Sequence, residues 1–148
     1  MQHSESIKSI AKSLLRVQCQ VGKVRKDGRG HNYVYPTLDH VIDVVRPLLT
    51  EAGIAVTQCM DQTGTGKDTL TTTLMDAESG EWIRSSYSLN AAGMKGVNDA
   101  QQMGAAITYA RRYCLLAILN IAPGDDDDAQ SIPNPGEQAR IDKEAKLV

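Results

Sequence analysis

The stretch Asn98-Asp99-Ala100-Gln101, continued by Ala106-Ile107-Thr108-Tyr109-Ala110-Arg111-Arg112-Tyr113, decides the fold of this chain. Asn98 is a favourable N-cap, and Gln101 lies three residues later, where its side chain can return to the cap amide in a capping box. Apolar residues then recur every three or four positions, as on one buried helical stripe: Met103, Ile107, Ala110, Cys114, Ala117 and Ile121. The pattern predicts a long helix with Arg111 and Arg112 toward the edges of that stripe.

Two helices are predicted upstream. The first follows Ser4, which can cap it, and extends over about 16 residues with apolar positions at helical spacing. The second begins at Thr37 and ends at Gly53, a favourable C′ residue. Pro47 should break or kink this second helix near its last turn, because proline lacks a backbone donor and clashes with the preceding turn.

Three strands are predicted between the second helix and the last one, at 54–59, 69–74 and 82–89. The short segment 76–80 suits an antiparallel hairpin between the second and third strands. The expected fold is α+β, with a small three-stranded antiparallel meander packed on a long C-terminal helix and preceded by two helices and a basic hairpin. The open edges of such a sheet invite either protection or pairing with another subunit.

Length and composition favour one domain at 1–123, followed by an acidic, proline- and glycine-containing tail or linker at 124–148. Three widely spaced cysteines form no Cys-x-x-Cys pair, which disfavours a disulfide framework and a zinc site. No apolar run approaches the length of a membrane span, and the first ten residues have no signal core. We therefore expect a soluble cytoplasmic protein.

The net charge of −2 conceals a polarity along the chain. Residues 1–123 hold 13 basic and 11 acidic residues, net +2, whereas residues 124–148 hold 3 basic and 7 acidic residues, net −4. The window 7–36 holds seven basic residues against Asp27 alone, net +6. Asp27-Gly28 is a turn dipeptide, so the segment from Gly22 to Gly30 should form a flexible basic hairpin or loop.

This basic segment is the candidate site for single-stranded DNA. Binding without sequence preference needs cations that follow phosphates and flat rings on which bases stack. The segment and its flank supply both: Lys23, Arg25, Lys26, Arg29, Tyr33 and Tyr35. The residues alone are equally compatible with a solvated loop that leads into a strand with core tyrosines.

Further candidate contacts are Arg111, Arg112 and Gln101 on the last helix, Lys95 in the glycine-containing connector, and Arg84 on the third strand. Adjacent arginines point about 100° apart on a helix, so one can contact phosphate while the other pairs with an acid such as Asp99 or a carboxylate of a neighbouring subunit. Two surface arginines are the alternative.

Other patterns favour neither catalysis nor a cofactor. Gly64-Thr65-Gly66-Lys67-Asp68 lacks the first glycine and the final hydroxyl of a phosphate-binding loop, so a hairpin turn without nucleotide hydrolysis is expected. The consecutive Asp125 to Asp128 cannot wrap a cation as spaced carboxylates can. The three histidines lack catalytic spacing. No cofactor or metal is predicted.

Together with Tyr33-Val34-Tyr35, Arg46-Pro47-Leu48-Leu49 and Ser79-Gly80-Glu81-Trp82-Ile83, the capped-helix motif resembles the Erf (essential recombination function) family of phage single-strand annealing proteins over roughly residues 5 to 128. The resemblance implies ATP-independent annealing of complementary strands by a ring or helical homo-oligomer in a bacterial host, with a β-β-β-α core like that of eukaryotic annealing proteins. Its implied partners are single-stranded DNA, the annealed duplex, and a phage exonuclease or a host single-strand-binding protein. The alternatives are a protecting protein that does not anneal and, with only the aspartate run to favour it, a metal-dependent nuclease.

Overall fold

The computed structural model describes residues 1–30, 34–62, 67–89 and 98–122. Within these ranges the chain forms three helices and two antiparallel sheets. The elements are β1 (Gln2–His3), α1 (Lys8–Gln20), β2 (Gly28–Arg29), β3 (Val34–Tyr35), α2 (Leu38–Glu51), β4 (Ile54–Gln62), β5 (Asp68–Asp76), β6 (Trp82–Ser88) and α3 (Asp99–Ile118). The expected mixture of helices with antiparallel strands is confirmed.

The larger sheet has the strand order β1-β6-β5-β4. β4 and β5 pair from Ile54↔Asp76 to Gln62↔Asp68, and β5 continues into an antiparallel pair with β6. The sheet has four strands instead of the expected three, because β1 pairs with the start of β6. A strand of two residues has no alternation that a sequence pattern could reveal.

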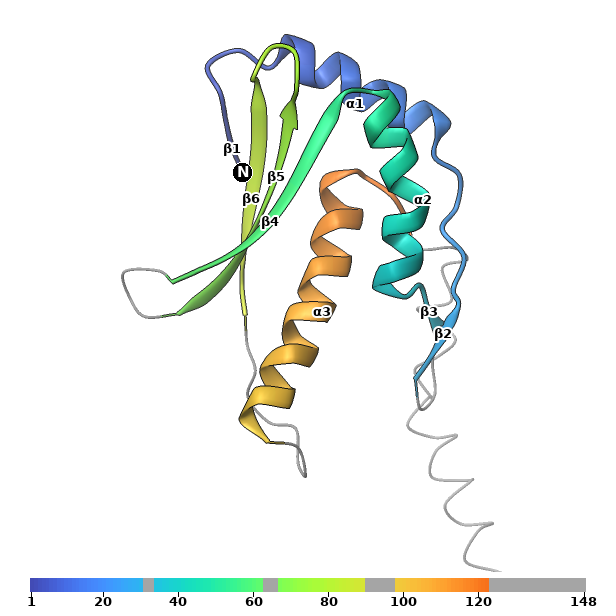
Figure 1. The fold of residues 1–148 in the computed structure, drawn as a ribbon, viewed down its shortest axis with the longest axis vertical. Coiled ribbons are helices and arrows are strands. Elements are labelled where there is room, and N and C mark those ends of the chain that lie inside the picture. Colours follow the sequence, from blue (N-terminus) through green and yellow to red (C-terminus); the bar gives the residue numbers. More distant parts are fainter. Residues whose placement is uncertain (31–33, 63–66, 90–97, 123–148) are drawn as a thin grey trace, which may run out of the picture.

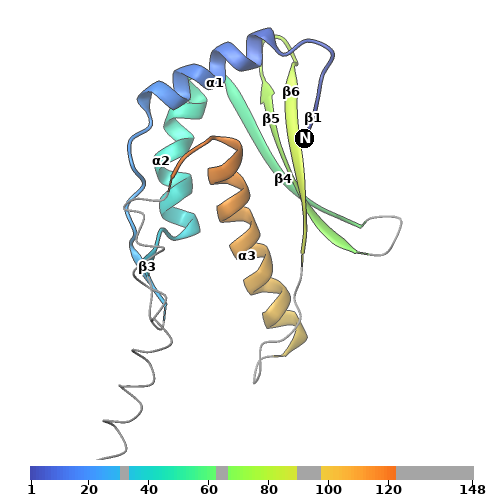
Figure 2. The same ribbon diagram turned by 180° about the vertical axis from the view of Figure 1, so that it is seen from behind.

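All three helices lie on one face of this sheet (Figure 1). α3 runs between the sheet and α2, while α1 crosses over one end of both, as the reverse view in Figure 2 also shows. Buried apolar residues of every layer meet in one core, among them Val17 of α1, Val45 of α2, Leu74 of β5 and Leu116 of α3. None of the helices in the described ranges covers the opposite face of the sheet.

Because α3 lies between the sheet and α2, its buried residues differ from those that the sequence predicted. The predicted stripe contributes Ala110 and Ile121 to the buried residues, but Ala117 of that stripe is exposed. A second buried side, which the sequence did not suggest, carries Arg112, Leu115, Leu116 and Leu119. One apolar stripe was the wrong expectation, because a helix with a sheet on one side and a helix on the other buries two.

The predicted start of α3 and both predicted ends of α2 are confirmed. Asn98 Oδ1 accepts the Gln101 amide at 2.8 Å, and the Asn98 amide donates to Gln101 Oε1 at 3.4 Å, which completes the capping box. Thr37 Oγ1 caps α2, and Gly53 follows it with φ +70°. Pro47 does not break α2, which continues to Glu51.

The start of α1 differs from the expectation that Ser4 caps it. The N-cap position is Ile7, whose side chain makes no capping bond. The carboxylate of Glu81 instead accepts the amides of Ser9 at 2.6 Å and Ile10 at 3.1 Å. Ser4 Oγ accepts the Trp82 amide, so it belongs to the junction with β6. A cap from a residue this distant along the chain leaves no local sequence signal.

Candidate nucleic-acid interface

The basic segment forms a small hairpin in which Gly28 pairs with Tyr35 and Arg29 pairs with Val34. The turn was expected at Asp27-Gly28, but Gly28 lies inside β2 and the chain reverses after Arg29. Residues 31–33, which include Tyr33, lie outside the described residues. Of the two candidate tyrosines, Tyr35 thus lies in the hairpin itself, opposite Gly28.

The hairpin is tied to the body of the protein. The Asp27 carboxylate accepts the Thr37 amide at 2.6 Å and the Thr37 hydroxyl at 2.7 Å. The backbone N–H of Thr37, followed by its hydroxyl, lowers the pKa of Asp27 below its ordinary value of 3.8. Val24, in the middle of the basic residues, is fully buried. Of the expected hairpin or loop, the structure thus shows the hairpin, which is anchored to α2 and to the core as far as residue 30.

The cations of this segment are largely available to solvent. Lys23, Arg25 and Arg29 are exposed, whereas Lys26 is half-buried. Lys23 and Lys26 also interact with other groups of the chain. The surface formed by Arg25 and Arg29 is therefore basic. Burial of Val24 and the bond from Thr37 to Asp27 hold it beside the start of α2.

Tyr35 connects this surface to α3. The Tyr35 ring lies so close to Gly28 that a Cβ at residue 28 would stand 2.7 Å from its Cε2 atom. The guanidinium carbon of Arg112 lies 4.4 Å from the centroid of the Tyr35 ring. Residue 28 must therefore be glycine for the ring to keep this place against the arginine.

Arg112 is buried among aromatic rings. Only 6% of it is exposed, and its Nε has no hydrogen-bond partner. Its guanidinium carbon also lies 4.9 Å from the Tyr113 ring centroid and 5.7 Å from that of Tyr109. Each such cation–π contact is worth about 0.5 to 2 kcal/mol, depending on desolvation. Sequence reasoning placed Arg112 among the candidates but missed Tyr109 and Tyr113, although their spacing of four residues on a predicted helix marks them as neighbours.

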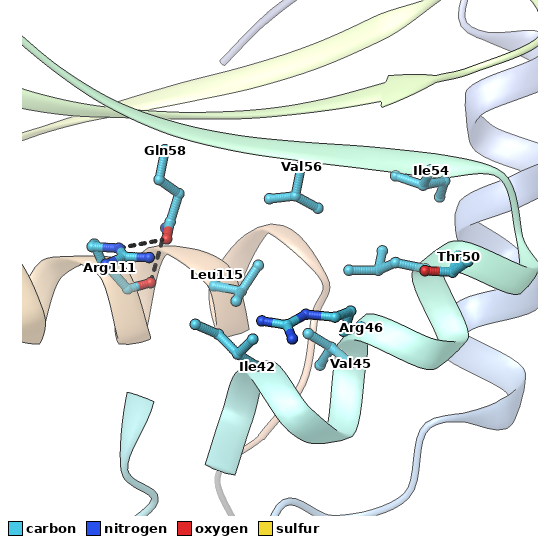
Figure 3. Close-up of a pocket in the computed structure, with 10 residues that line it drawn as sticks. Ile42, Val45, Arg46, Thr50, Ile54, Val56, Gln58, Arg111 and Leu115 are labelled. Atoms are coloured by element: carbon cyan, nitrogen blue, oxygen red, sulfur yellow. Dashed lines mark hydrogen bonds between the residues drawn. The ribbon is translucent and has the colours of Figure 1, made fainter. Parts of the chain in front are cut away.

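Arg111 points to a different side of α3 from Arg112. Its Nε donates to Gln58 Oε1 at 3.3 Å, and Gln58 Nε2 donates to the Arg111 carbonyl at 2.9 Å (Figure 3). Asp99, the acid expected to pair with one of the arginines, is 12 residues from Arg111 along the helix, or about 18 Å. Pairing with Asp99 is therefore wrong for both arginines, and the alternative, a carboxylate of a neighbouring subunit, stays a prediction.

Gln58 and Arg111 line a pocket of about 330 Å³ between β4, α2 and α3 (Figure 3). Six of its ten lining residues are apolar, and Arg46 of α2 supplies a second guanidinium. Because the apolar wall is continuous with the core through Val45 and Leu115, the pocket resembles a gap between layers with a basic rim.

The remaining predicted site residues do not gather with the hairpin. Arg84 stacks on Trp82 at 4.1 Å, and it follows buried Ile83, so strand alternation directs it to the sheet face opposite the helices. Gln101 is exposed at the start of α3 and is engaged in the capping box. Lys95 lies outside the described residues. The structure thus brings the hairpin, Tyr35 and Arg112 together and separates Arg84 from them.

The structure describes only part of the two motifs that the sequence analysis set aside, at residues 64–68 and 125–128. Residues 63–66 lie outside the described residues, but the chain enters and leaves them in the paired strands β4 and β5, whereas a phosphate-binding loop is followed by a helix. Asp125 to Asp128 also lie outside them. Among the described residues no group of three metal-binding side chains occurs, and none of their helices is long and apolar enough to cross a membrane.

Comparison with known families gives one result. The model of the ERF superfamily matches residues 10–147, which is nearly the whole chain, and the protein therefore belongs to this family. Membership implies a broad role in phage recombination and single-strand annealing. No curated protein and no solved structure gives a significant match.

Proposed function

We propose that this protein binds single-stranded DNA without sequence preference and anneals complementary strands without ATP, as a ring or helical homo-oligomer. The observation that carries the proposal is the anchored basic hairpin joined through Tyr35 to Arg112, in a chain of the ERF superfamily. Exposed cations hold phosphates whatever the sequence, and aromatic rings accept any base.

The arrangement of β4, β5, β6 and α3 supports the finer comparison with the β-β-β-α core of eukaryotic annealing proteins. β4 is an edge strand over all of its nine residues, so among the described strands its outer backbone groups have no sheet partner. An open edge of this length favours association with another subunit. Successive subunits would align their basic hairpins along one strand, and many weak contacts would then add into a long footprint.

Neutralised phosphates explain how annealing can proceed without nucleotide hydrolysis. Lys and Arg contacts reduce the repulsion between two strands while the bases stay accessible to a complement. A phage exonuclease that exposes single strands, or a host single-strand-binding protein, would be a natural partner for such an activity.

The test is a renaturation assay with two complementary oligonucleotides, one carrying a fluorophore and the other a quencher. The annealing rate should rise above the spontaneous rate without ATP and without magnesium. A rate below the spontaneous one would identify a protecting protein instead. Shortening of the labelled strand that requires magnesium would identify a nuclease, and either result would overturn the proposal.

A further inference from the structure

Tyr109 and Tyr113 of α3 form a pair of rings that are open to solvent. Tyr109 is 52% exposed and Tyr113 is 36% exposed. Their ring centroids lie 4.4 Å apart with an interplanar angle of 45°. Tyrosines that served the core would bury their rings, whereas these two present aromatic surface to the solvent beside each other.

Arg112 fixes the position of this pair. Its buried guanidinium lies within 6 Å of the Tyr109, Tyr113 and Tyr35 ring centroids, and its Nε donor has no protein partner. Aromatic faces are a weak substitute for the water that a guanidinium loses on burial. A permanent positive charge is therefore held behind exposed rings, where it favours electron-rich or anionic groups in front of them.

The exposed pair is also connected to the basic hairpin. Arg112 contacts Tyr35, which pairs with Gly28 in the ladder that contains Arg29. The exposed cations of the hairpin and the exposed rings of α3 are thus connected through Tyr35 and Arg112. A strand of nucleic acid needs that combination, because its phosphates are anionic and each of its bases has a flat face.

We propose that Tyr109 and Tyr113 are the base-stacking platform of this protein for single-stranded DNA, with Arg112 as the residue that positions them. The inference rests on the proposed function and assigns its aromatic contacts to α3. Arg25 and Arg29 hold the backbone of the same strand. Base stacking on tyrosine is independent of sequence, so the platform adds affinity without adding base selection.

The experiment compares two probes with the full-length protein: an oligothymidylate and an abasic oligomer of the same length, which keeps the phosphates but has no bases. The variants are the double substitutions Y109L/Y113L, which keeps apolar bulk and helix propensity, and Y109F/Y113F, which keeps the rings. Tyr87→Leu on β6, where Tyr87 is 48% exposed, is the matched control. Circular dichroism and light scattering report on folding and on oligomer size.

Y109L/Y113L should lose about 5-fold to 150-fold in affinity for oligothymidylate for each base that stacks, while its affinity for the abasic oligomer stays unchanged. Tyr87→Leu should bind both probes as the unmodified protein does, and Y109F/Y113F should keep the ratio of its affinity for oligothymidylate to its affinity for the abasic oligomer, because both rings remain. Arg112→Lys keeps the charge but not the planar group. It should lower the ratio of the affinity for oligothymidylate to the affinity for the abasic oligomer.

Equal affinity of Y109L/Y113L and the unmodified protein for oligothymidylate would overturn the inference and leave the proposed function standing. A change in oligomer size with an unchanged ratio between the probes would assign the tyrosines to contact with a second copy, and would overturn it too. Failure of the proposed function would be visible separately, as an unmodified protein that binds neither probe.

Discussion

Gly28 and Tyr35 are direct partners in the small sheet, and the tyrosine ring covers the glycine so closely that a methyl group there would meet it at 2.7 Å. The contact decides where the ring stands, and through it where the basic hairpin meets α3.

Gly28→Ala should therefore displace Tyr35 from Arg112 and weaken binding of single-stranded DNA several-fold, with a loss of stability of about 1 to 3 kcal/mol from overpacking. Gly22→Ala is the control, since no atom lies within 4 Å of a Cβ at residue 22. Fluorescence anisotropy with a labelled oligonucleotide and urea unfolding measure the two effects. Equal results for both variants would contradict the positional role of the glycine.

Binding of single-stranded DNA should be independent of sequence and should weaken steeply with salt, because the site is a window of net +6 without a base-reading element. The slope of log affinity against log salt concentration measures the number of neutralised phosphates. An affinity that stays flat from low to moderate salt would be incompatible with phosphate neutralisation.

The joint replacement of Lys23, Arg25, Lys26 and Arg29 by alanine should abolish annealing and preserve the fold, since three of the four are exposed and the anchoring residue Val24 is retained. The renaturation rate and the circular dichroism spectrum check the two statements. Normal annealing by this folded variant would place the phosphate contacts elsewhere, with Arg111 and Arg112 next to be examined.

Removal of residues 124–148 should preserve folding and oligomerisation, and should strengthen DNA binding or leave it unchanged. The segment carries net −4 beside a body of net +2, so it can oppose the approach of a polyanion. Screening over about 8 to 10 Å restricts this effect, which should grow at low salt. A truncated protein that becomes monomeric, unfolds or binds more weakly would show that the segment belongs to the domain.

Acid should destabilise the protein through Asp76 and Glu81. Asp76 accepts bonds from Ser79 and Ser13, led by the Ser79 amide, and these lower its pKa below the ordinary 3.8. The Ser6 hydroxyl, followed by the amides at the start of α1, lowers the pKa of Glu81 below the ordinary 4.5. Since both values are depressed in the folded state, the stabilisation is complete above about pH 5 and is lost as pH falls through the folded values.

Asp76→Asn should reduce the dependence of unfolding free energy on pH below about pH 5, whereas Asp43→Asn, at an exposed position of α2, should not. Urea unfolding between pH 3 and pH 7 measures the difference. Identical pH profiles for the Asp76 variant and the unmodified protein would remove Asp76 from the acid response.

Local patterns predicted most of the secondary structure, because caps and alternation act within a few residues. The capping box at Asn98, the start of α2 at Thr37, the glycine after α2 and the three long strands were all predicted from such signals. The features that sequence could not provide depend on distant contacts. Glu81 caps α1 from more than 70 residues away, and β1 exists only because β6 offers it an edge.

The candidate site was predicted in its composition but not in its geometry. The basic residues and Tyr35 could be named from charge and ring chemistry, but the turn was wrongly placed at Asp27-Gly28. In the structure Asp27 accepts a hydrogen bond from Thr37 at the start of α2, and Gly28 leaves space for the Tyr35 ring. The burial of Arg112 could not be predicted, because α3 lies between the sheet and α2. A residue beside the predicted apolar stripe is buried when a second layer covers that side of the helix.

The junction of β1 with β6 has a practical consequence. Trp82 is the single tryptophan of the chain, its backbone exchanges hydrogen bonds with Ser4, and the guanidinium of Arg84 covers its indole. The molecule thus carries one tryptophan fluorophore beside its five tyrosines, placed where detachment of the N-terminal strand would alter its emission. The stack of Arg84 on Trp82 lies on the sheet face away from α3. Tryptophan emission can therefore follow unfolding of the sheet, while labelled DNA in the same sample reports binding at the hairpin and α3.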